Sequence, residues 1–284
     1  MLSPDKEISN ALKADNPEDL RKALPLVLAS PRQSQLIQRI LHQSATNGYV
    51  DCYKIIAPLV FTKIESLSSA MHIPQAIRSA IRGKHTAIAE DLLDGVLTLA
   101  VPDALRYITT CALHPAIEMG NTALVKRILG ESILFPEVKK ALVCAAANSQ
   151  VDVAKVLLTD LLDETKAHPR ALATLATSDK DKTEEQIERM INFSQAQALA
   201  AGLLGSIKVN AHEVTALLLW PYLGVLAKIR PDTHERFNKK DIFNQIPDEV
   251  YVNLGWDDCN KLLESGIPLF VEERILRCLE LCVP

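Results

Sequence analysis

Hydrophobic runs long enough to cross a membrane are missing from this 284-residue sequence. A membrane span is suggested by about 18 or more consecutive apolar residues. The nearest candidate, 211–229, is interrupted by His212, Pro221 and Lys228. Residues 1–7 contain no apolar stretch of the kind found in a secretory signal. The sequence therefore predicts neither a membrane span nor a secretory leader.

Glycine is scarce, and the motifs of common catalytic and cofactor sites are missing. The chain has 10 glycines, so glycine-rich loops that hold phosphate groups are not expected. Neither the G-x-x-x-x-G-K-[ST] and G-x-G-x-x-G nucleotide motifs nor the H-E-x-x-H zinc motif occurs. The G-x-S-x-G nucleophile motif is absent as well. We therefore expect no enzymatic activity and no cofactor.

Aromatic residues and excess positive charge are also low. Aromatics make up 5% of the chain, which favours closely packed helices over a β-sandwich, because strands prefer aromatic and β-branched residues. The 31 Lys and Arg residues are outnumbered by 35 Asp and Glu residues, for a net charge of −4. A general nucleic-acid binder usually carries a basic field. The composition thus predicts an all-α protein that does not bind nucleic acid.

None of the six cysteines forms a C-x-x-C pair. Five lie in apolar stretches predicted to be helical, which is typical of reduced, buried thiols in a cytoplasmic compartment. Cys278 and Cys282 share one face of the last predicted helix, but no further ligand for zinc lies nearby in the sequence. Cys259 with His234 is a poor catalytic pair, since the two aspartates before the thiol would raise its pKa. We expect structural thiols and no metal site.

One pattern recurs along the chain: a helix with small residues, a short break, and a helix rich in Leu, Ile and Val. In its clearest copy the turn is Gly120, with Ala116 four residues before it and Val125 five residues after it. Weaker copies are spaced 29 to 37 residues apart and have these turn residues: Asp15, Gly48, Gly83 and Ser149. Two looser copies follow at 172–191 and 198–219. Glycine suits such a turn because it accepts a left-handed backbone.

The same pattern predicts the core. Aliphatic residues at helical spacing form one apolar face on each helix. A single helix pair cannot bury that face alone, so the pairs are expected to stack. The residues expected to be buried include Leu113, Val125, Leu129, Leu157 and Leu158.

The copy around Gly120 resembles the ankyrin-repeat family, whose repeats carry T-P-L-H-x-A, a turn glycine and V-x-x-L-L. Leu113, His114 and Ala116 match the first motif. The resemblance implies an α-solenoid of stacked helix pairs. It also implies that His114 and its counterpart His42 bond to the backbone of the repeat rather than to a metal.

The chain departs from the ankyrin pattern in three ways. Cys111-Ala112 replaces the Thr-Pro opening, and Pro115 is expected inside the first helix, near its start. The Gly-Ala-Asp/Asn segment that forms the ankyrin β-hairpin is missing, which leaves open whether the hairpins are absent or remodelled. A HEAT or tetratricopeptide solenoid and an irregular helical bundle are the alternatives. The Trp-Leu-Gly-Tyr pattern of tetratricopeptides does not occur.

The repeat pattern covers residues 1–229 and changes beyond them. Residues 230–284 bring in aromatic side chains, among them Trp256, and close with an amphipathic helix predicted at 271–281. A solenoid needs its last apolar face covered. We therefore predict an ankyrin-like array at 1–229 and a helical C-terminal cap at 230–284, with an independent functional domain as the alternative.

The resemblance also implies a binding face. Ankyrin-like arrays bind proteins through their concave face, where the two residues before each turn glycine point at the ligand. Carried over, these are Thr46 and Asn47, Ile81 and Arg82, Glu118 and Met119, and Ala147 and Asn148. Five of them are the predicted partner-binding residues: Asn47, Arg82, Glu118, Met119 and Asn148.

The function expected from this resemblance is a protein–protein interaction module or adaptor in the cytoplasm. One form of it is a bacterial or viral effector that is delivered into a host cell and occupies a host protein. The alternative is a HEAT-like nucleic-acid-binding protein or an enzyme. Arrays that grip DNA line their groove with Lys and Arg, and Glu118 among the predicted contacts argues against that alternative.

Overall fold

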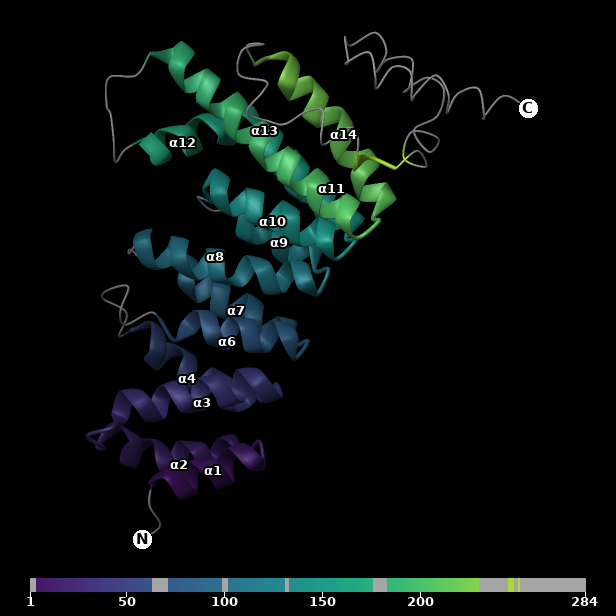
Figure 1. Ribbon diagram of the computed structural model, residues 1–284. Coiled ribbons are helices and arrows are strands. Elements are labelled where there is room, and N and C mark those ends of the chain that lie inside the picture. The colour runs from purple at the N-terminus through teal and green to yellow at the C-terminus, as the bar shows by residue number, and fades with distance from the viewer. Residues whose placement is uncertain are drawn as a thin grey trace. The chain divides into compact units, whose positions relative to one another are not determined.

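A computed structural model describes residues 4–62, 71–98, 102–130, 133–175, 183–229, 245–247 and 250 (Figure 1). These residues contain thirteen α-helices and no strand, so the all-α prediction is confirmed. None of the described helices combines the length and the hydropathy that a membrane crossing requires. The chain divides into two compact units, Met1–Met119 and Gly120–Pro284.

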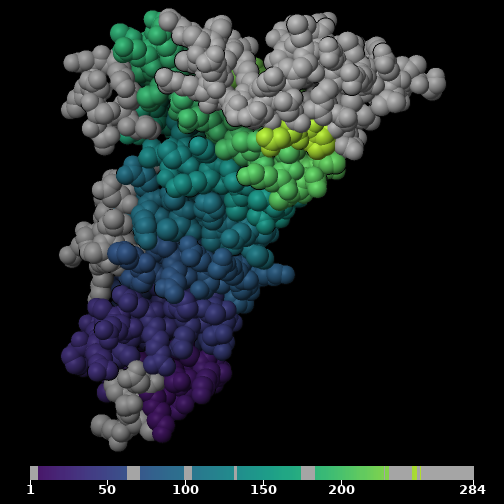
Figure 2. Space-filling model, in the orientation of Figure 1, coloured from purple at the N-terminus to yellow at the C-terminus, as the bar shows by residue number. Residues whose placement is uncertain are grey.

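The first unit is built from helix pairs. Its helices are α1 (Pro4–Lys13), α2 (Pro17–Leu28), α3 (Gln33–Asn47), α4 (Val50–Phe61), α6 (Ile73–Arg82), α7 (Thr86–Leu97) and α8 (Pro102–Glu118). The two helices of a pair pack together, as α3 does with α4 and α6 with α7. First helices also pack on one another in the order α1, α3, α6, α8, and second helices in the order α2, α4, α7. The pairs therefore form successive layers (Figure 2).

The turns inside the helix pairs of both units share one backbone geometry. A positive φ occurs at Asp15, Gly48, Lys84, Gly120, Ser149 and Asn210. In five of these turns the next residue donates its N–H to the carbonyl five residues earlier, as Tyr49 does to Ser44 at 3.0 Å. This bond satisfies a carbonyl that the end of the helix would leave unpaired. In each case the accepting carbonyl belongs to the small residue four positions before the left-handed residue. The small residue of the sequence pattern therefore also marks the carbonyl that closes the turn.

One predicted turn residue is wrong by one position. Gly83 has a right-handed φ of −74° at the end of α6, and the left-handed residue is Lys84, with a φ of 62°. Glycine is needed at 83 for a different reason. A Cβ there would lie 2.6 Å from the His85 ring and 3.1 Å from the carbonyl oxygen of Thr46. Close approach of the preceding turn, rather than left-handed backbone, explains Gly83.

The second unit contains α9 (Thr122–Leu129), α10 (Phe135–Ala147), α11 (Val151–Leu162), α12 (Glu164–Leu175), α13 (Glu184–Lys208) and α14 (His212–Ala227). The pair α10–α11 packs on the pair α13–α14, mainly through α10 and α13. The loose copy at 198–219 is thus a helix–turn–helix with its turn at Asn210. The second half of the copy at 172–191 is the start of α13. Helix α12 is an additional element that contacts α11 and α13.

Four of the five predicted core residues are buried. Leu113, Val125, Leu129 and Leu157 are at most 2% exposed. Leu158 is only partly buried, so that prediction is wrong. Leu161, four residues after Leu157, is fully buried in its place. The buried face of α11 follows the i, i+4 spacing of a helix, and Leu158 lies at its margin.

Pro115 lies in the last turn of its helix rather than near the start. Helix α8 begins at Pro102 and ends at Glu118, so thirteen helical residues precede this proline. Without an N–H, Pro115 cannot donate to the carbonyl of Cys111. The start of this helix predicted from the ankyrin-like motif is too late, because α8 begins well before the residues that match the motif.

Most of the predicted C-terminal cap lies outside the described residues. Within 230–284 the structure describes 245–247 and 250, where Ile246 and Val250 are buried. The predicted helix at 271–281, together with Trp256, Cys259, Cys278, Cys282 and His234, falls outside the described part of the chain.

Candidate functional site

The pre-turn residues of the first unit lie at the exposed ends of first helices. Asn47 ends α3, Arg82 ends α6, Glu118 ends α8 and Met119 follows it. All four are exposed, and Met119, at 37%, is among the more exposed large apolar side chains. Each first helix packs on the next, so the unit presents these ends in sequence order. These four side chains are therefore accessible at the surface, and their binding role stays a prediction.

Two of the predicted site residues contact each other. Arg82 donates from Nη2 to Oε2 of Glu118 at 3.0 Å, which links the ends of α6 and α8. The two side chains remain 57% and 42% exposed. An ion pair this exposed contributes at most about 1 kcal/mol to stability. Both groups therefore stay available to a ligand, and their charges offset each other at this point of the surface.

The asparagines at these positions are engaged with their own helices. Asn47 donates from Nδ2 to the carbonyl of Gln43 at 3.0 Å. In the second unit Asn148 makes the same contact with the carbonyl of Cys144 at 2.8 Å. At Asn148 the backbone N–H donates to the same carbonyl, at 3.1 Å, so each side-chain amide folds back onto its own helix. Sequence reasoning assigned both residues to ligand binding and missed this structural contact.

Ile81 cannot belong to an exposed binding face. Its side chain is 3% exposed, so it is part of the core. The one-residue shift of this turn accounts for the difference, because Arg82 is two residues before Lys84, as Glu118 is two residues before Gly120. The position that corresponds to Asn47 and Met119 is Gly83.

A contact that sequence reasoning missed connects the second helix of one pair to the turn of the pair before it. His85, the N-cap of α7, brings Nε2 within 3.2 Å of the carbonyl oxygen of Thr46. A Cβ at Gly48 would lie 2.4 Å from the same ring. In the second unit Gln150, the N-cap of α11, occupies the corresponding place against Gly120, 2.8 Å from a Cβ built there. The residue directly after each left-handed position makes this contact, and a large polar side chain there is the sequence signal that could have predicted it.

The implied role of the two repeat histidines is not the one observed at His42. Its Nε2 lies 3.2 Å from Oγ of Ser79, a side chain of the next pair. The backbone contact expected of a repeat histidine is made instead by His85. Within the described ranges no group of three or more His, Cys, Asp and Glu side chains could hold a metal ion.

Two buried side chains of the first unit, Tyr53 and Cys52, have raised pKa values. Tyr53 on α4 donates its hydroxyl to Oδ2 of Asp91 on α7 at 2.5 Å, and burial together with that carboxylate raises the pKa of the phenol above its ordinary value. Burial, with smaller contributions from Asp15 and Asp51, raises the pKa of the Cys52 thiol to about 12. A nucleophilic cysteine needs a lowered pKa. These groups therefore belong to the core.

The second unit contains a buried ion pair. Arg170 on α12 and Asp160 on α11 are each 5% exposed and bond to each other. Arg170 also donates from Nε to the carbonyl of Ile133 at 2.7 Å, and Lys166 donates to the other carboxylate oxygen of Asp160 at 2.7 Å. Buried charges are tolerated when they are paired and hydrogen-bonded in this way. The cluster fixes the additional helix α12 to the rest of the unit.

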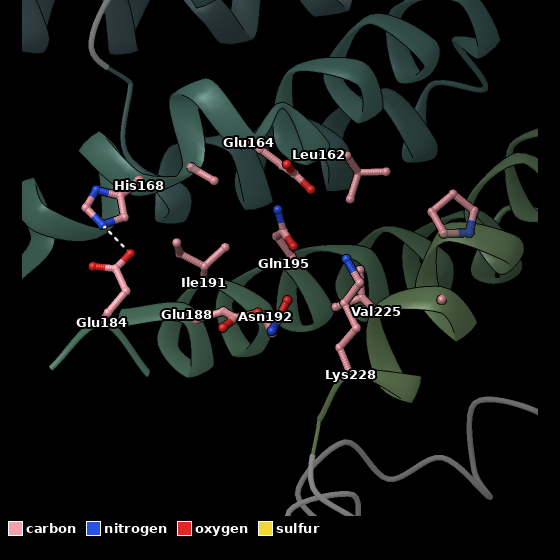
Figure 3. Close-up of a pocket in the computed structure, with 13 residues that line it drawn as sticks. Leu162, Glu164, His168, Glu184, Glu188, Ile191, Asn192, Gln195, Val225 and Lys228 are labelled. Carbon is pink, nitrogen blue, oxygen red and sulfur yellow. Dashed lines mark ion pairs between the residues drawn. The ribbon is translucent and has the colours of Figure 1, made fainter. Parts of the chain in front are cut away.

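A cavity of about 540 Å³ lies beside this helix (Figure 3). It is lined by the start of α12, the first half of α13 and the end of α14, together with Leu162 at the end of α11. The α13 side chains that line it follow helical spacing: Glu184, Glu188, Ile191, Asn192 and Gln195. None of the sequence predictions pointed here. The sequence signal that could have indicated the cavity is the pair of polar residues Asn192 and Gln195 on a buried face of α13.

Comparison of the chain with protein-family models, with curated protein sequences and with solved structures finds no match.

Proposed function

We propose that this chain is a protein-binding module built as an α-solenoid of degenerate ankyrin-like helix pairs. The observation that carries the proposal is the repeated turn, in which one backbone geometry recurs at 15, 48, 84, 120, 149 and 210. The side chains exposed just before these turns differ from one pair to the next. A constant framework with varied exposed positions is what a surface needs if it is to read one particular partner.

The chemistry of the pre-turn surface favours a protein partner over nucleic acid. Arg82 is paired with Glu118, and Met119 beside them is apolar and exposed. Protein interfaces combine apolar contact with directed polar contacts, and both Arg and Met are enriched in them. A polyanion would instead require several unopposed cations. The mixed surface therefore supports an adaptor that binds through the concave face, with Asn47, Arg82, Glu118, Met119 and Asn148 as its proposed contacts.

The finer proposal is a cytoplasmic adaptor without enzymatic activity, of which an effector occupying a host protein is one form. The proposal draws on the absence of catalytic motifs in the sequence and on the raised pKa of Cys52. Its test begins with affinity capture from cell lysate and identification of the captured protein by mass spectrometry. The captured protein is then produced pure, and its affinity for the chain is measured directly.

The decisive variant combines Arg82→Glu with Met119→Ala. Both side chains are exposed, so the folded state should be retained. The affinity for the purified partner should fall at least tenfold, or about 1.4 kcal/mol, since Arg is enriched among the few interface residues that contribute about 2 kcal/mol or more. The matched control is Lys54→Glu with Leu26→Ala, which makes the same kinds of change at exposed positions of the second helices α4 and α2. Unchanged affinity in the first variant, with its thermal stability intact, would move the binding site away from the pre-turn surface.

A further inference from the structure

The cavity between α12, α13 and α14 has a charged rim and an amide floor. Figure 3 shows His168 and Glu184 at one end of it and Lys228 at the other, with Asn192 and Gln195 between them. Its walls are completed by apolar side chains, among them Leu162, Ile191 and Val225. Its volume, about 540 Å³, is within the range of roughly 300–1,000 Å³ that is usual for ligand sites.

The floor carries hydrogen-bonding capacity that the described residues leave unused. Asn192 is 8% exposed, and its side-chain amide makes no hydrogen bond to another described residue. Gln195 is 6% exposed and donates from Nε2 to the carbonyl of Leu161 at 2.9 Å, which leaves its carbonyl oxygen as an acceptor. Buried polar groups are normally satisfied. The two amides that line the cavity are therefore available for hydrogen bonds to a polar ligand.

The charges around the cavity are mainly negative. Among the described residues, Glu164, Glu184 and Glu188 line it, against one lysine, Lys228. Glu184 lies 3.2 Å from Nε2 of His168, whereas no ion pair joins Lys228 to another residue in the described ranges. A site with low-dielectric walls concentrates the field of its charges. The cavity therefore attracts cations, and Lys228 is a charge of the wrong sign for such a ligand.

We propose that this cavity binds an alkyl cation, a guanidinium or ammonium group on a short apolar stem. The amide oxygens of Asn192 and Gln195 would accept hydrogen bonds from its N–H groups, because a guanidinium offers five donors and no acceptor. Leu162, Ile191 and Val225 would contact the stem, and Glu164 and Glu188 would balance the charge. The cation belongs either to a free small molecule or to an Arg or Lys side chain of a partner protein, and this second source rests on the protein-binding function proposed above.

The test uses probes that separate charge from shape. The first pair is n-butylguanidinium and its neutral analogue n-butylurea, with n-butyrate as an anion. The second pair is an acetylated, amidated Gly-Arg-Gly peptide and the same peptide with citrulline in place of Arg. Binding to the full chain is measured by ligand-observed NMR. We expect saturable binding of the cation in each pair and at least fivefold weaker binding of its neutral analogue. Binding of the peptide but not of butylguanidinium would support the proposal and identify a side chain as the source.

Three variants locate the site. Lys228→Met should tighten binding of the cation and Glu188→Gln should weaken it, each roughly two- to fivefold, because single exposed charges contribute up to about 1 kcal/mol. Asn192→Leu should weaken it about tenfold through the lost hydrogen bond. The matched control is Glu213→Gln, at the opposite end of α14 and outside the cavity. Each variant is first checked for unchanged helicity and thermal midpoint.

Several results would overturn the proposal. Equal binding of butylurea, tighter binding of butyrate, binding of neither cation, or weaker cation binding by Lys228→Met would each contradict it. So would an unchanged affinity in Glu188→Gln and Asn192→Leu together. These outcomes do not contradict the proposed protein binding at the pre-turn surface. The test of that proposal uses the Arg82 and Met119 variant and a captured protein partner. The two proposals therefore fail separately.

Discussion

Gly48 meets two demands at one residue. Its φ is 76°, a conformation that costs other residues energy, and the ring of His85 lies where its Cβ would be. Gly120 meets the same two demands with Gln150 as the neighbour. Gly224 meets neither, because it lies within α14 and a Cβ there would contact nothing within 4 Å.

We therefore expect Gly48→Ala to destabilise the protein by about 1–2 kcal/mol from the left-handed backbone, with a further loss from displacement of His85. Gly224→Ala should stabilise it by about 0.5–1 kcal/mol, since alanine is the better helix residue. Chemical denaturation of both variants measures the two free energies of unfolding. If Gly48→Ala proved neutral, the turn geometry assigned to the repeat would be wrong.

His72 makes stability depend on pH. Burial lowers its pKa below the ordinary value of 6.5, so the unfolded chain binds a proton at a higher pH than the folded chain does. Stability from this group is therefore complete above pH 6.5 and is lost as pH falls toward the lowered pKa. Denaturation at pH 7.5 and pH 5.5 should show a smaller loss in His72→Gln than in the parent protein. An equal loss in both would place the acid sensitivity elsewhere.

At the scale of single helices, proline has opposite effects in different places. Pro17 opens α2 after the N-cap Asn16, where a missing N–H and a fixed φ are favourable. Pro58 lies inside α4 and is exposed, so it deprives Lys54 of a hydrogen-bond donor without filling the core. Pro25 in α2 follows the left-handed residue Asp15 at the same distance in sequence as Pro58 follows Gly48. An interior proline therefore recurs at one position in these two second helices.

Pro58→Ala should therefore stabilise the protein by about 2 kcal/mol. A proline in a helix interior costs about 3 kcal/mol relative to alanine, and the greater freedom of the unfolded alanine chain offsets up to about 1 kcal/mol of the gain. Pro17→Ala should give no gain or a small loss. The thermal midpoints of the two variants, measured side by side, check this contrast. A similar gain for both would mean that position in the helix is not what matters.

At the scale of the whole molecule, stacking of the pairs decides which apolar side chains are buried. Leu129 is 2% exposed on α9, which packs on α11, whereas Leu158 lies at the margin of α11 and is partly exposed. Both are leucines at sequence positions that match the repeat. The difference between them comes from the neighbouring helices and not from the residue.

Leu129→Ala should accordingly cost roughly 2–5 kcal/mol of the free energy of unfolding, the usual range for a core leucine. Leu158→Ala should cost clearly less, because part of its surface is already in contact with water. Urea denaturation of the two variants at one temperature provides the comparison. Equal losses would show that the packing of α11 differs from the one described.

The sequence by itself determined the helical class and nearly every turn. Small residues, left-handed positions and aliphatic spacing are local signals, and they placed the turns at 15, 48, 120 and 149 correctly. They also identified Leu113, Val125, Leu129 and Leu157 as core residues. Local signals succeed here because a helix end and its turn are stabilised by hydrogen bonds between residues at most five apart.

Only the tertiary structure decided the contacts between pairs. The need for glycine at 83 comes from the His85 ring and from the carbonyl oxygen of Thr46 in the neighbouring pair. The ion pair of Arg82 with Glu118 joins residues 36 positions apart, and the cavity collects residues from four helices, α11 to α14. No short-range pattern encodes such contacts, because they arise when separate apolar faces are buried against one another and bring distant polar groups together.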